Sequence, residues 1–187
     1  MKEFYKLNQL LEDRIKTTQI KIKIKEFVYN MDKKYCRDLL TKIDIYKSSG
    51  KWGKLEKIYI FASNRLKSKK NADERISKIL TEILQKYLNF LLEQKNYSKS
   101  LKTAKEISIH GIGKLKSEAN KIIQQLENFM QALAAERKKN FNIALEYYTK
   151  VVTLGANSYL GVIARSKKPK LRLKHILSRA DEAIRKK

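Results

Sequence analysis

Residues 136–154, with the sequence ERKKNFNIALEYYTKVVTL, decide the fold that we predict for this chain. Lys138, Lys139 and Asn140 interrupt an apolar run, and Asn140 suits the N-cap of a new helix. After the interruption, apolar residues recur at helical spacing, namely Ile143, Ala144, Tyr147, Tyr148, Val151 and Leu154. The stretch therefore predicts a polar turn followed by one helix.

The same pattern of a polar turn, an aromatic residue and a helical stripe occurs twice earlier. Trp52 follows the turn at Gly50, Tyr97 follows the turn at 94–96, and Phe141 follows the turn in the quoted stretch. The first two aromatics are 45 residues apart and the last two are 44 apart. A fixed period of this size is typical of helical-repeat proteins. We therefore predict three helical hairpins whose aromatics Trp52, Tyr97, Phe141 and Tyr148 pack in the repeat core.

The chain before the first turn is expected to be helical as well. One amphipathic helix is predicted through Ile15, and another begins where Asn30 or Asp32 supplies an N-cap. Residues 19–25 alternate like a strand, but the apolar stripe of residues 20–31 also fits a helix. We favour a helix, because an unpaired isoleucine-rich strand would expose an edge prone to aggregation.

The later segments are also predicted from their caps and stripes. Asn71–Glu74 resembles a capping box, and it precedes a stripe over residues 76–92 that is wide enough to face two neighbouring helices. Gly111 and Gly113 end one helix, and a long helix follows over residues 115–134. Residues 155–158 end the helix of the quoted stretch, residues 159–164 form a short apolar segment, and Pro169 is placed to start a last helix.

The predicted fold is all-α, a right-handed array of antiparallel helical hairpins with about seven or eight helices. Its parts are a helical segment at residues 1–34, three hairpins at 35–164, and a basic capping helix or arm at 165–187.

These hairpins resemble tetratricopeptide-type repeats. In the last hairpin, Phe141, Ala144 and Tyr148 occupy the family's aromatic and small positions, with Ala132 and Ala135 at close-packing positions of the helix before it. The corresponding residues are Tyr97, Ser100 and Ala104 in the middle hairpin and Trp52, Leu55 and Tyr59 in the first. The period exceeds the family's roughly 34 residues, which predicts longer helices or an extra linking turn. The resemblance implies a groove that binds a peptide or a partner protein.

The C-terminal part also resembles the three-helix microtubule-interacting and transport domain. The resemblance rests on residues 140–148 and on Ser178–Ile184, which contains a similar Arg-Ala-acid motif. Gly155, Gly161 and Pro169 depart from that bundle's pattern. The resemblance implies binding of short helical tails.

Charge is the strongest compositional signal. The formal net charge is +24 over 187 residues, which favours a polyanionic partner, whether nucleic acid, an anionic membrane surface or an acidic protein. Lysine far outnumbers arginine, however, and an AT-rich coding sequence yields that excess whatever the function. The cations are densest near the C-terminus, where the candidate polyanion-binding residues are Arg165, Lys167, Lys168, Lys170, Arg172, Lys174 and Arg179.

Motifs for chemistry are weak. Residues 111–114 lack the spacing of a phosphate loop, and neither His110 nor His175 is followed four residues later by a carboxylate or a cysteine. Cys36, the only cysteine, is expected to be buried and inert, and it fits a reducing compartment. With no transmembrane segment or signal sequence recognised, we expect a cytoplasmic protein without catalytic residues, cofactor or metal. The predicted function is a non-catalytic scaffold that binds another protein, and the alternative is a basic helical nucleic-acid-binding protein.

Overall fold

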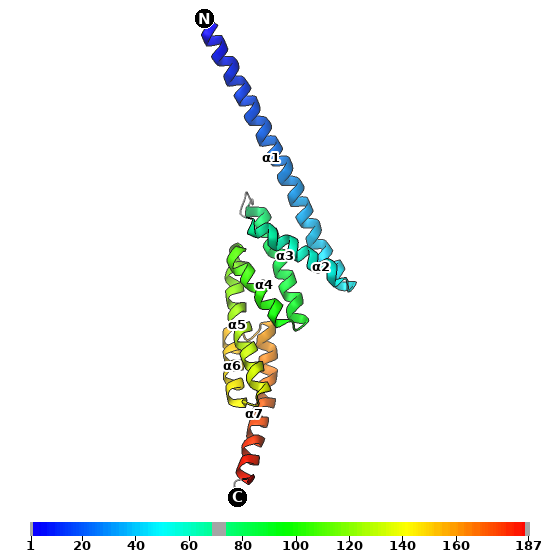
Figure 1. Ribbon diagram of the computed structural model, residues 1–187, viewed down its shortest axis with the longest axis vertical. Coiled ribbons are helices and arrows are strands. Elements are labelled where there is room, and N and C mark those ends of the chain that lie inside the picture. Colours follow the sequence, from blue (N-terminus) through cyan, green and yellow to red (C-terminus); the bar gives the residue numbers. More distant parts are fainter. Residues whose placement is uncertain (1, 69–73, 186–187) are drawn as a thin grey trace.

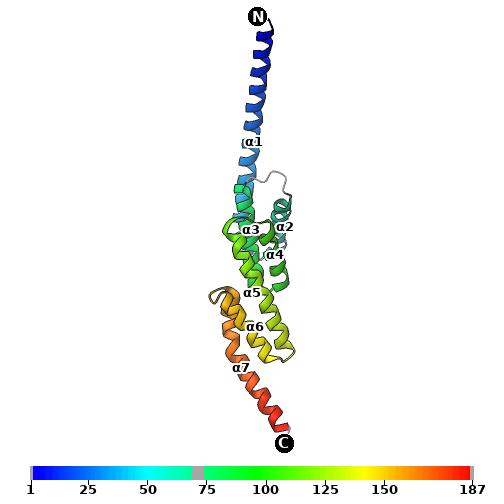
Figure 2. The same cartoon turned by 90° about the vertical axis from the view of Figure 1, so that its left-hand side faces the viewer.

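The computed structural model describes residues 2–68 and 74–185, and for residues 2–10, 13, 24 and 28 it describes the backbone only. This part of the chain contains helices and turns but no strand, which confirms the all-α prediction. Its seven helices are α1 (Lys2–Ser48), α2 (Trp52–Lys67), α3 (Glu74–Glu93), α4 (Tyr97–His110), α5 (Gly113–Arg137), α6 (Phe141–Leu154) and α7 (Tyr159–Arg185). The molecule is elongated, with its termini at opposite ends (Figure 1 and Figure 2).

Helix contacts follow a regular scheme. Each helix packs against the next one along the chain, and the odd-numbered helices also contact one another in succession, α1 with α3, α3 with α5 and α5 with α7. On the other side, α2 contacts α4. The buried apolar residues of these helices form one hydrophobic cluster that extends from Cys36 of α1 to Leu171 of α7.

Three junctions of closely similar backbone geometry join the helices of each pair. The middle residue of each junction has a positive φ, namely Gly50 at 66°, Lys95 at 55° and Lys139 at 60°. The next amide donates to the carbonyl five residues back at 2.9 Å, in the pairs Lys51–Tyr46, Asn96–Leu91 and Asn140–Ala135. This is the Schellman motif that ends helices. The turn period predicted from the sequence is thus present in the backbone.

Helix α3 is the most deeply buried element. Leu80, Ile83, Leu84 and Leu88 are fully buried, and α3 contacts α1, α2, α4 and α5. The predicted wide stripe is therefore confirmed.

Helix α3 has 20 residues and α5 has 25, so the extra length of the period lies in these two helices. The capping box predicted at Asn71–Glu74 falls largely outside the described residues.

Helix α1 corrects the prediction of separate N-terminal helices. A single helix runs from Lys2 to Ser48, so residues 19–25 are helical as favoured, and the predicted boundary at 34/35 lies inside the helix. No glycine or proline occurs before Gly50 to break it. Asp32, expected as an N-cap, instead accepts a hydrogen bond from Arg65 of α2 at 2.8 Å. The N-terminal half of α1 extends beyond the other helices (Figure 1).

Helix α7 corrects the prediction at the other end. It begins at Tyr159 and continues through Pro169, so residues 159–164 are not a separate segment and the boundary at 164/165 is internal. Proline lacks the amide that would bond to the Arg165 carbonyl, which weakens a helix locally. Ala164 and Leu171 are both buried and hold the helix against the protein on either side of Pro169. The C-terminal part of α7 is tilted relative to its first turns (Figure 2).

A buried glutamine organises the turn between α6 and α7. The Gln125 side-chain amide, on α5, donates to the carbonyls of Val151 and Gly155 at 3.2 Å and to the Ser158 hydroxyl at 2.9 Å. A Cβ placed on Gly161 would overlap the Gly155 carbonyl oxygen. The first turn of α7 therefore approaches this turn more closely than any side chain permits.

Replacing Lys139 by glycine should stabilise the protein. A non-glycine residue in the left-handed region is strained, and Lys139 has a φ of 60°. We expect Lys139→Gly to raise the free energy of unfolding by about 0.5 to 1 kcal/mol. Lys138→Gly removes the same charge at a residue with a φ of −79°, so it should be destabilising instead. Urea denaturation of both variants measures the two signs, and equal effects would contradict the turn geometry.

Replacing Gly161 by alanine should destabilise the protein. The added methyl group meets backbone atoms of the α6–α7 turn, which yield less readily than the end of a flexible side chain. We expect a loss of about 2 kcal/mol or more. Gly53→Ala on α2 is the matched control, because a Cβ there meets nothing within 4 Å. That variant should be neutral or slightly stabilising in the same thermal or urea denaturation.

Candidate functional site

A cleft between two hairpins lies where the α3–α4 turn faces α5. It has a volume of about 620 Å³. We call it the hairpin groove, and its lining residues are Gln94, Lys95, Asn96, Tyr97, Ser98, Met130, Leu133, Ala134 and Arg137. A cleft of this size accommodates one or two side chains of a bound segment.

The junction geometry builds one wall of the hairpin groove. The left-handed residue Lys95 turns the chain, and the Asn96 side chain caps α4 by accepting a hydrogen bond from the Lys99 amide at 3.2 Å. Tyr97 then begins α4, and its ring lies edge-on to Phe129 of α5 with centroids 5.0 Å apart. Phe129 is fully buried, so this aromatic contact fixes the distance between the two walls.

The chemistry of the hairpin groove is apolar with a basic rim. Met130 and Leu133 are half-buried, and Ala134 is exposed beside them. Lys95 and Arg137 add positive charge, and the lining contains no carboxylate. Methionine adapts its shape to different apolar partners. The groove therefore suits an apolar side chain with acidic residues next to it.

The aromatics predicted for the repeat core differ in burial. Tyr148 is fully buried, and Tyr97 and Phe141 are half-buried against the core. The prediction is wrong for Trp52, which keeps 46 % of its surface exposed. Trp52 stacks on Phe90 of α3 with centroids 4.9 Å apart, but it does so at the surface of the first hairpin. Trp52 and Tyr97 thus share one arrangement, an aromatic at the start of a helix lying on an aromatic of the next helix.

A buried carboxylate joins α2 to α4, and the sequence did not reveal it. Glu106 is 9 % exposed and accepts hydrogen bonds from Tyr59 and Ser63 at 2.8 Å and from Lys67 at 2.9 Å. Burial would raise the pKa of Glu106, but these donors outweigh burial and hold that pKa below its ordinary value. In the sequence, the only indication of this cluster was an acidic residue next to an apolar one, Ile107. An anion held by three donors stabilises structure and is a poor proton donor at neutral pH.

A second carboxylate joins α5 to α7 and involves one of the predicted polyanion-binding residues. Glu136 accepts hydrogen bonds from the Tyr148 hydroxyl and from Lys167, both at 2.9 Å. Burial opposes ionisation, yet the two donors keep the pKa of Glu136 below its ordinary value. Lys167 is therefore engaged in holding α7 in place.

The other predicted polyanion-binding residues are spread along α7. Arg165 donates to the Ala156 carbonyl at 3.1 Å. Lys168 is half-buried and lines, with Arg172, a cleft of about 530 Å³ between α6 and α7. Lys170, Arg172, Lys174 and Arg179 are exposed. The structure thus leaves a smaller group of cations accessible than the sequence indicated.

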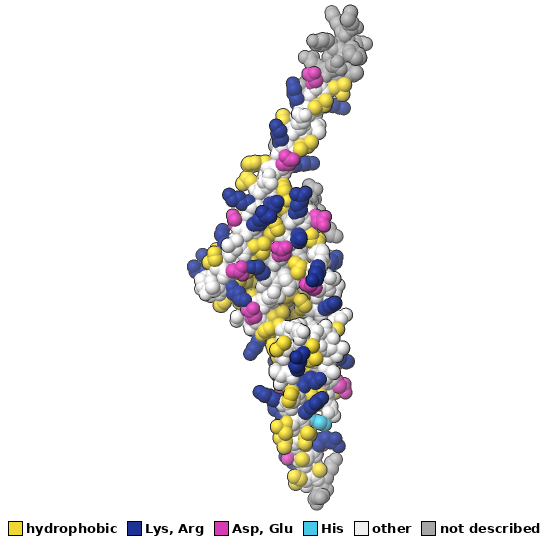
Figure 3. Space-filling view, turned by 180° about the vertical axis from the view of Figure 1, so that it is seen from behind, with side chains coloured by type: hydrophobic (Ala, Val, Ile, Leu, Met, Phe, Trp, Pro, Cys, Tyr) yellow, Lys and Arg dark blue, Asp and Glu magenta, His cyan; other side chains and the backbone are white. Residues whose placement is uncertain are grey.

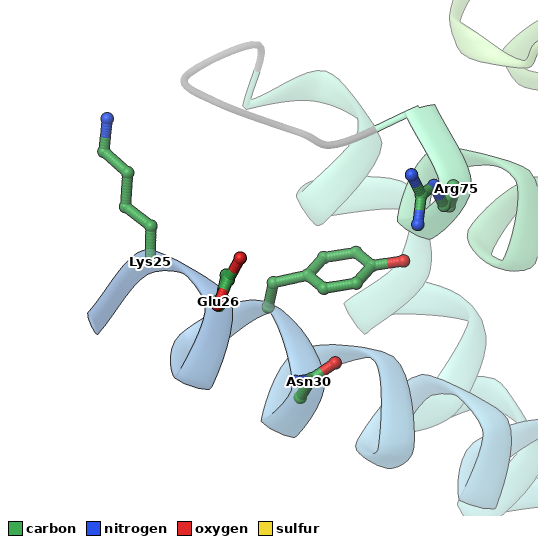
Figure 4. A pocket seen from close by; sticks show the side chains of 5 residues that line it. Lys25, Glu26, Asn30 and Arg75 are labelled. Carbon is green, nitrogen blue, oxygen red and sulfur yellow. The ribbon is translucent and has the colours of Figure 1, made fainter. Parts of the chain in front are cut away.

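A further cleft of about 430 Å³ lies between α1 and the start of α3 (Figure 4). Lys25, Glu26 and Asn30 come from α1, and Arg75 faces them from α3. The Arg75 guanidinium lies 5.7 Å from the Tyr29 ring centroid. The cleft mixes both charge signs, and its polar groups do not converge on one point.

Other chemistry finds little support in residues 2–68 and 74–185. This part of the chain contains no group of three or more histidine, cysteine or acidic residues placed to hold a metal. Cys36 is 3 % exposed, and burial together with the nearby Asp32 raises the pKa of its thiol. No helix described here is long and apolar enough to cross a bilayer.

The chain matches no protein family, no curated protein and no solved structure. Its function is therefore inferred from the geometry and chemistry of its own residues.

The Glu106 cluster should make the free energy of unfolding decrease as the pH falls into the acid range. The pKa of Glu106 is lower in the folded protein than its ordinary value of 4.5, so its contribution is fully present above about pH 4.5. That contribution is lost as the pH falls through the lower folded value. We expect Glu106→Gln to cost about 1 to 3 kcal/mol at pH 7 and to flatten the loss of stability in acid. Thermal denaturation between pH 7 and pH 3 measures both effects.

The control for this prediction is Glu146→Gln, which removes an exposed carboxylate on α6. It should leave both the stability at pH 7 and its acid dependence close to those of the wild type. An unchanged acid dependence in Glu106→Gln would contradict the role of the cluster.

Proposed function

We propose that this protein is a non-catalytic scaffold that binds a segment of a partner protein in the hairpin groove. In this proposal, its hairpins form a right-handed, tetratricopeptide-like array. The observation that carries it is the geometric equivalence of the three junctions, together with the succession of contacts between α1, α3, α5 and α7. Arrays of this kind present extended surfaces between repeats, where partner segments bind.

The groove chemistry specifies the bound segment. Met130 and Leu133 offer apolar contact, and Lys95 and Arg137 offer positive charge at the rim. A helical or extended segment with one large apolar side chain and adjacent acidic residues satisfies both. The buried Glu106 and the half-buried Glu136 both form ion pairs that hold helices together, which favours a binding role over an acid–base role.

A second candidate function is nucleic-acid binding through α7. The observation in its favour is the set of exposed cations Lys170, Arg172, Lys174 and Arg179. Phosphate contacts would make the affinity fall steeply with salt, whereas an apolar groove would respond weakly. The salt dependence therefore separates the two functions.

The groove proposal predicts that Ala134→Glu weakens partner binding. Ala134 is exposed in the hairpin groove, so a carboxylate there repels an acidic ligand without disturbing the core. We expect a loss of about tenfold or more in affinity. The measurement is affinity capture from native extract with and without nuclease, followed by titration of each captured protein at low and high salt.

The matched control is Gln131→Glu, which adds the same charge to an exposed position on the same helix outside the groove. It should bind partners like the wild type. Partners that disappear after nuclease treatment would favour the nucleic-acid function. Equal binding by Ala134→Glu and the wild type would exclude the groove as the binding site.

A further inference from the structure

The last three turns of α7 carry an apolar stripe that nothing in the described part of the chain covers. We call it the outer stripe, and it consists of Leu173, Ile176, Leu177, Ala180 and Ile184. The exposed fractions of Leu173, Ile176, Leu177 and Ile184 are 59, 62, 56 and 71 %. Figure 3 shows hydrophobic side chains among cations at this end of the molecule. Isolated exposed leucines are ordinary, but a continuous row on one helix indicates a contact surface.

The outer stripe faces away from the body of the protein. Leu160, Ala164 and Leu171 hold α7 against its neighbours and are buried. With about 100° between successive residues of a helix, Leu171 lies opposite the outer stripe. The stripe covers about a third of the helix circumference. It therefore plays no part in the packing of α7.

Cations border the outer stripe on both sides. Arg172 and Arg179 are seven residues apart and lie along one border, while Lys170, Lys174 and Arg185 lie along the other. All five are exposed. Asp181 lies on the second border and Glu182 on the opposite side of the helix, so the positive charges prevail.

These two features together select one kind of partner. Nucleic acid would engage the cations but leave four large apolar side chains in water. A second copy would bring the same cations against one another, and a single coiled-coil helix would cover a narrower seam than this stripe. An anionic bilayer surface takes both, because apolar side chains enter the acyl boundary while flanking lysines and arginines extend to the headgroups.

We propose that α7 lies on anionic lipid surfaces through its outer stripe. The apolar side chains supply insertion, and Arg172, Arg179, Lys170, Lys174 and Arg185 supply attraction to phosphate and carboxylate headgroups. This role goes beyond the scaffold function and uses residues of α7, none of which lines the hairpin groove. A scaffold with both surfaces would hold its partner at a membrane.

Vesicle sedimentation with the full chain tests the proposal. The probes are vesicles of phosphatidylcholine alone and vesicles that also contain phosphatidylserine. We expect the wild type to bind the anionic vesicles and to bind the neutral ones weakly. Leu173→Gln with Leu177→Gln should reduce binding about tenfold or more, since both side chains would enter the bilayer. Arg172→Gln with Arg179→Gln should also reduce it about tenfold or more.

Matched controls separate the outer stripe from general stickiness and charge. Ile60→Gln with Ile109→Gln removes two exposed apolar side chains on other helices, and Lys102→Gln with Lys121→Gln removes two exposed cations on α4 and α5. Both control pairs should bind vesicles within about twofold of the wild type, because neither touches α7. Ala134→Glu should also bind normally, so failure of the groove proposal is distinguishable from failure of this one.

Three results would overturn the proposal. The first is an absence of binding to anionic vesicles by the wild type. The second is a leucine variant that binds them like the wild type, which would reduce the effect to general charge attraction. The third is a loss in the control pairs equal to that in the α7 variants. If an acidic amphipathic peptide binds the wild type but not the leucine variant, and vesicles do not bind, the stripe belongs to a protein partner.

Discussion

The fold depends on one backbone constraint, the left-handed residue in each three-residue junction. At Gly50, Lys95 and Lys139 the chain reverses, and an amide hydrogen bond spanning five residues closes each turn. So short a connection requires the following helix to pack antiparallel to the one before it. It also sets where the next helix starts, and at each junction that first residue is an aromatic. Lysine adopts the strained conformation twice, which shows that the packing on either side outweighs the local cost.

Buried and half-buried polar groups then connect helices that the junctions do not join. Glu106 joins α2 to α4, Glu136 joins α5 to α7, and Gln125 joins α5 to the α6–α7 turn. Each is satisfied by several partners, as a buried polar group must be. Because ordinary apolar contacts are not directional, these hydrogen bonds specify which helices meet and in which register. Because Lys167 donates to the Glu136 carboxylate, it is not available as a free cation on the surface.

The two proposed binding surfaces arise from different structural causes. The hairpin groove lies between the α3–α4 turn and α5. The ring of Tyr97, at the start of α4, contacts Phe129 of α5 and sets the distance between these two walls. The outer stripe exists because α7 continues beyond the helices that support it (Figure 2). One surface is concave and the other is convex, so they suit a peptide segment and an extended surface respectively. The large positive charge strengthens attraction at both, but the apolar residues determine what each can hold.

Local properties of the sequence determined the helical class, the three turn positions and the buried stripe of α3, because turn chemistry and periodicity act within a few residues. The sequence did not determine the lengths of α1 and α7. Asp32 was predicted to cap a helix, but its carboxylate accepts a hydrogen bond from Arg65 of another helix. Pro169 was predicted to start a helix, but the buried residues Ala164 and Leu171 anchor one continuous helix on both sides of it. The exposure of Trp52, the Glu106 and Glu136 clusters and the hairpin groove were decided only by tertiary structure. All of these features depend on contacts between residues 10 or more positions apart in the chain. The spacing of residues along the chain carries no information about which distant side chains meet.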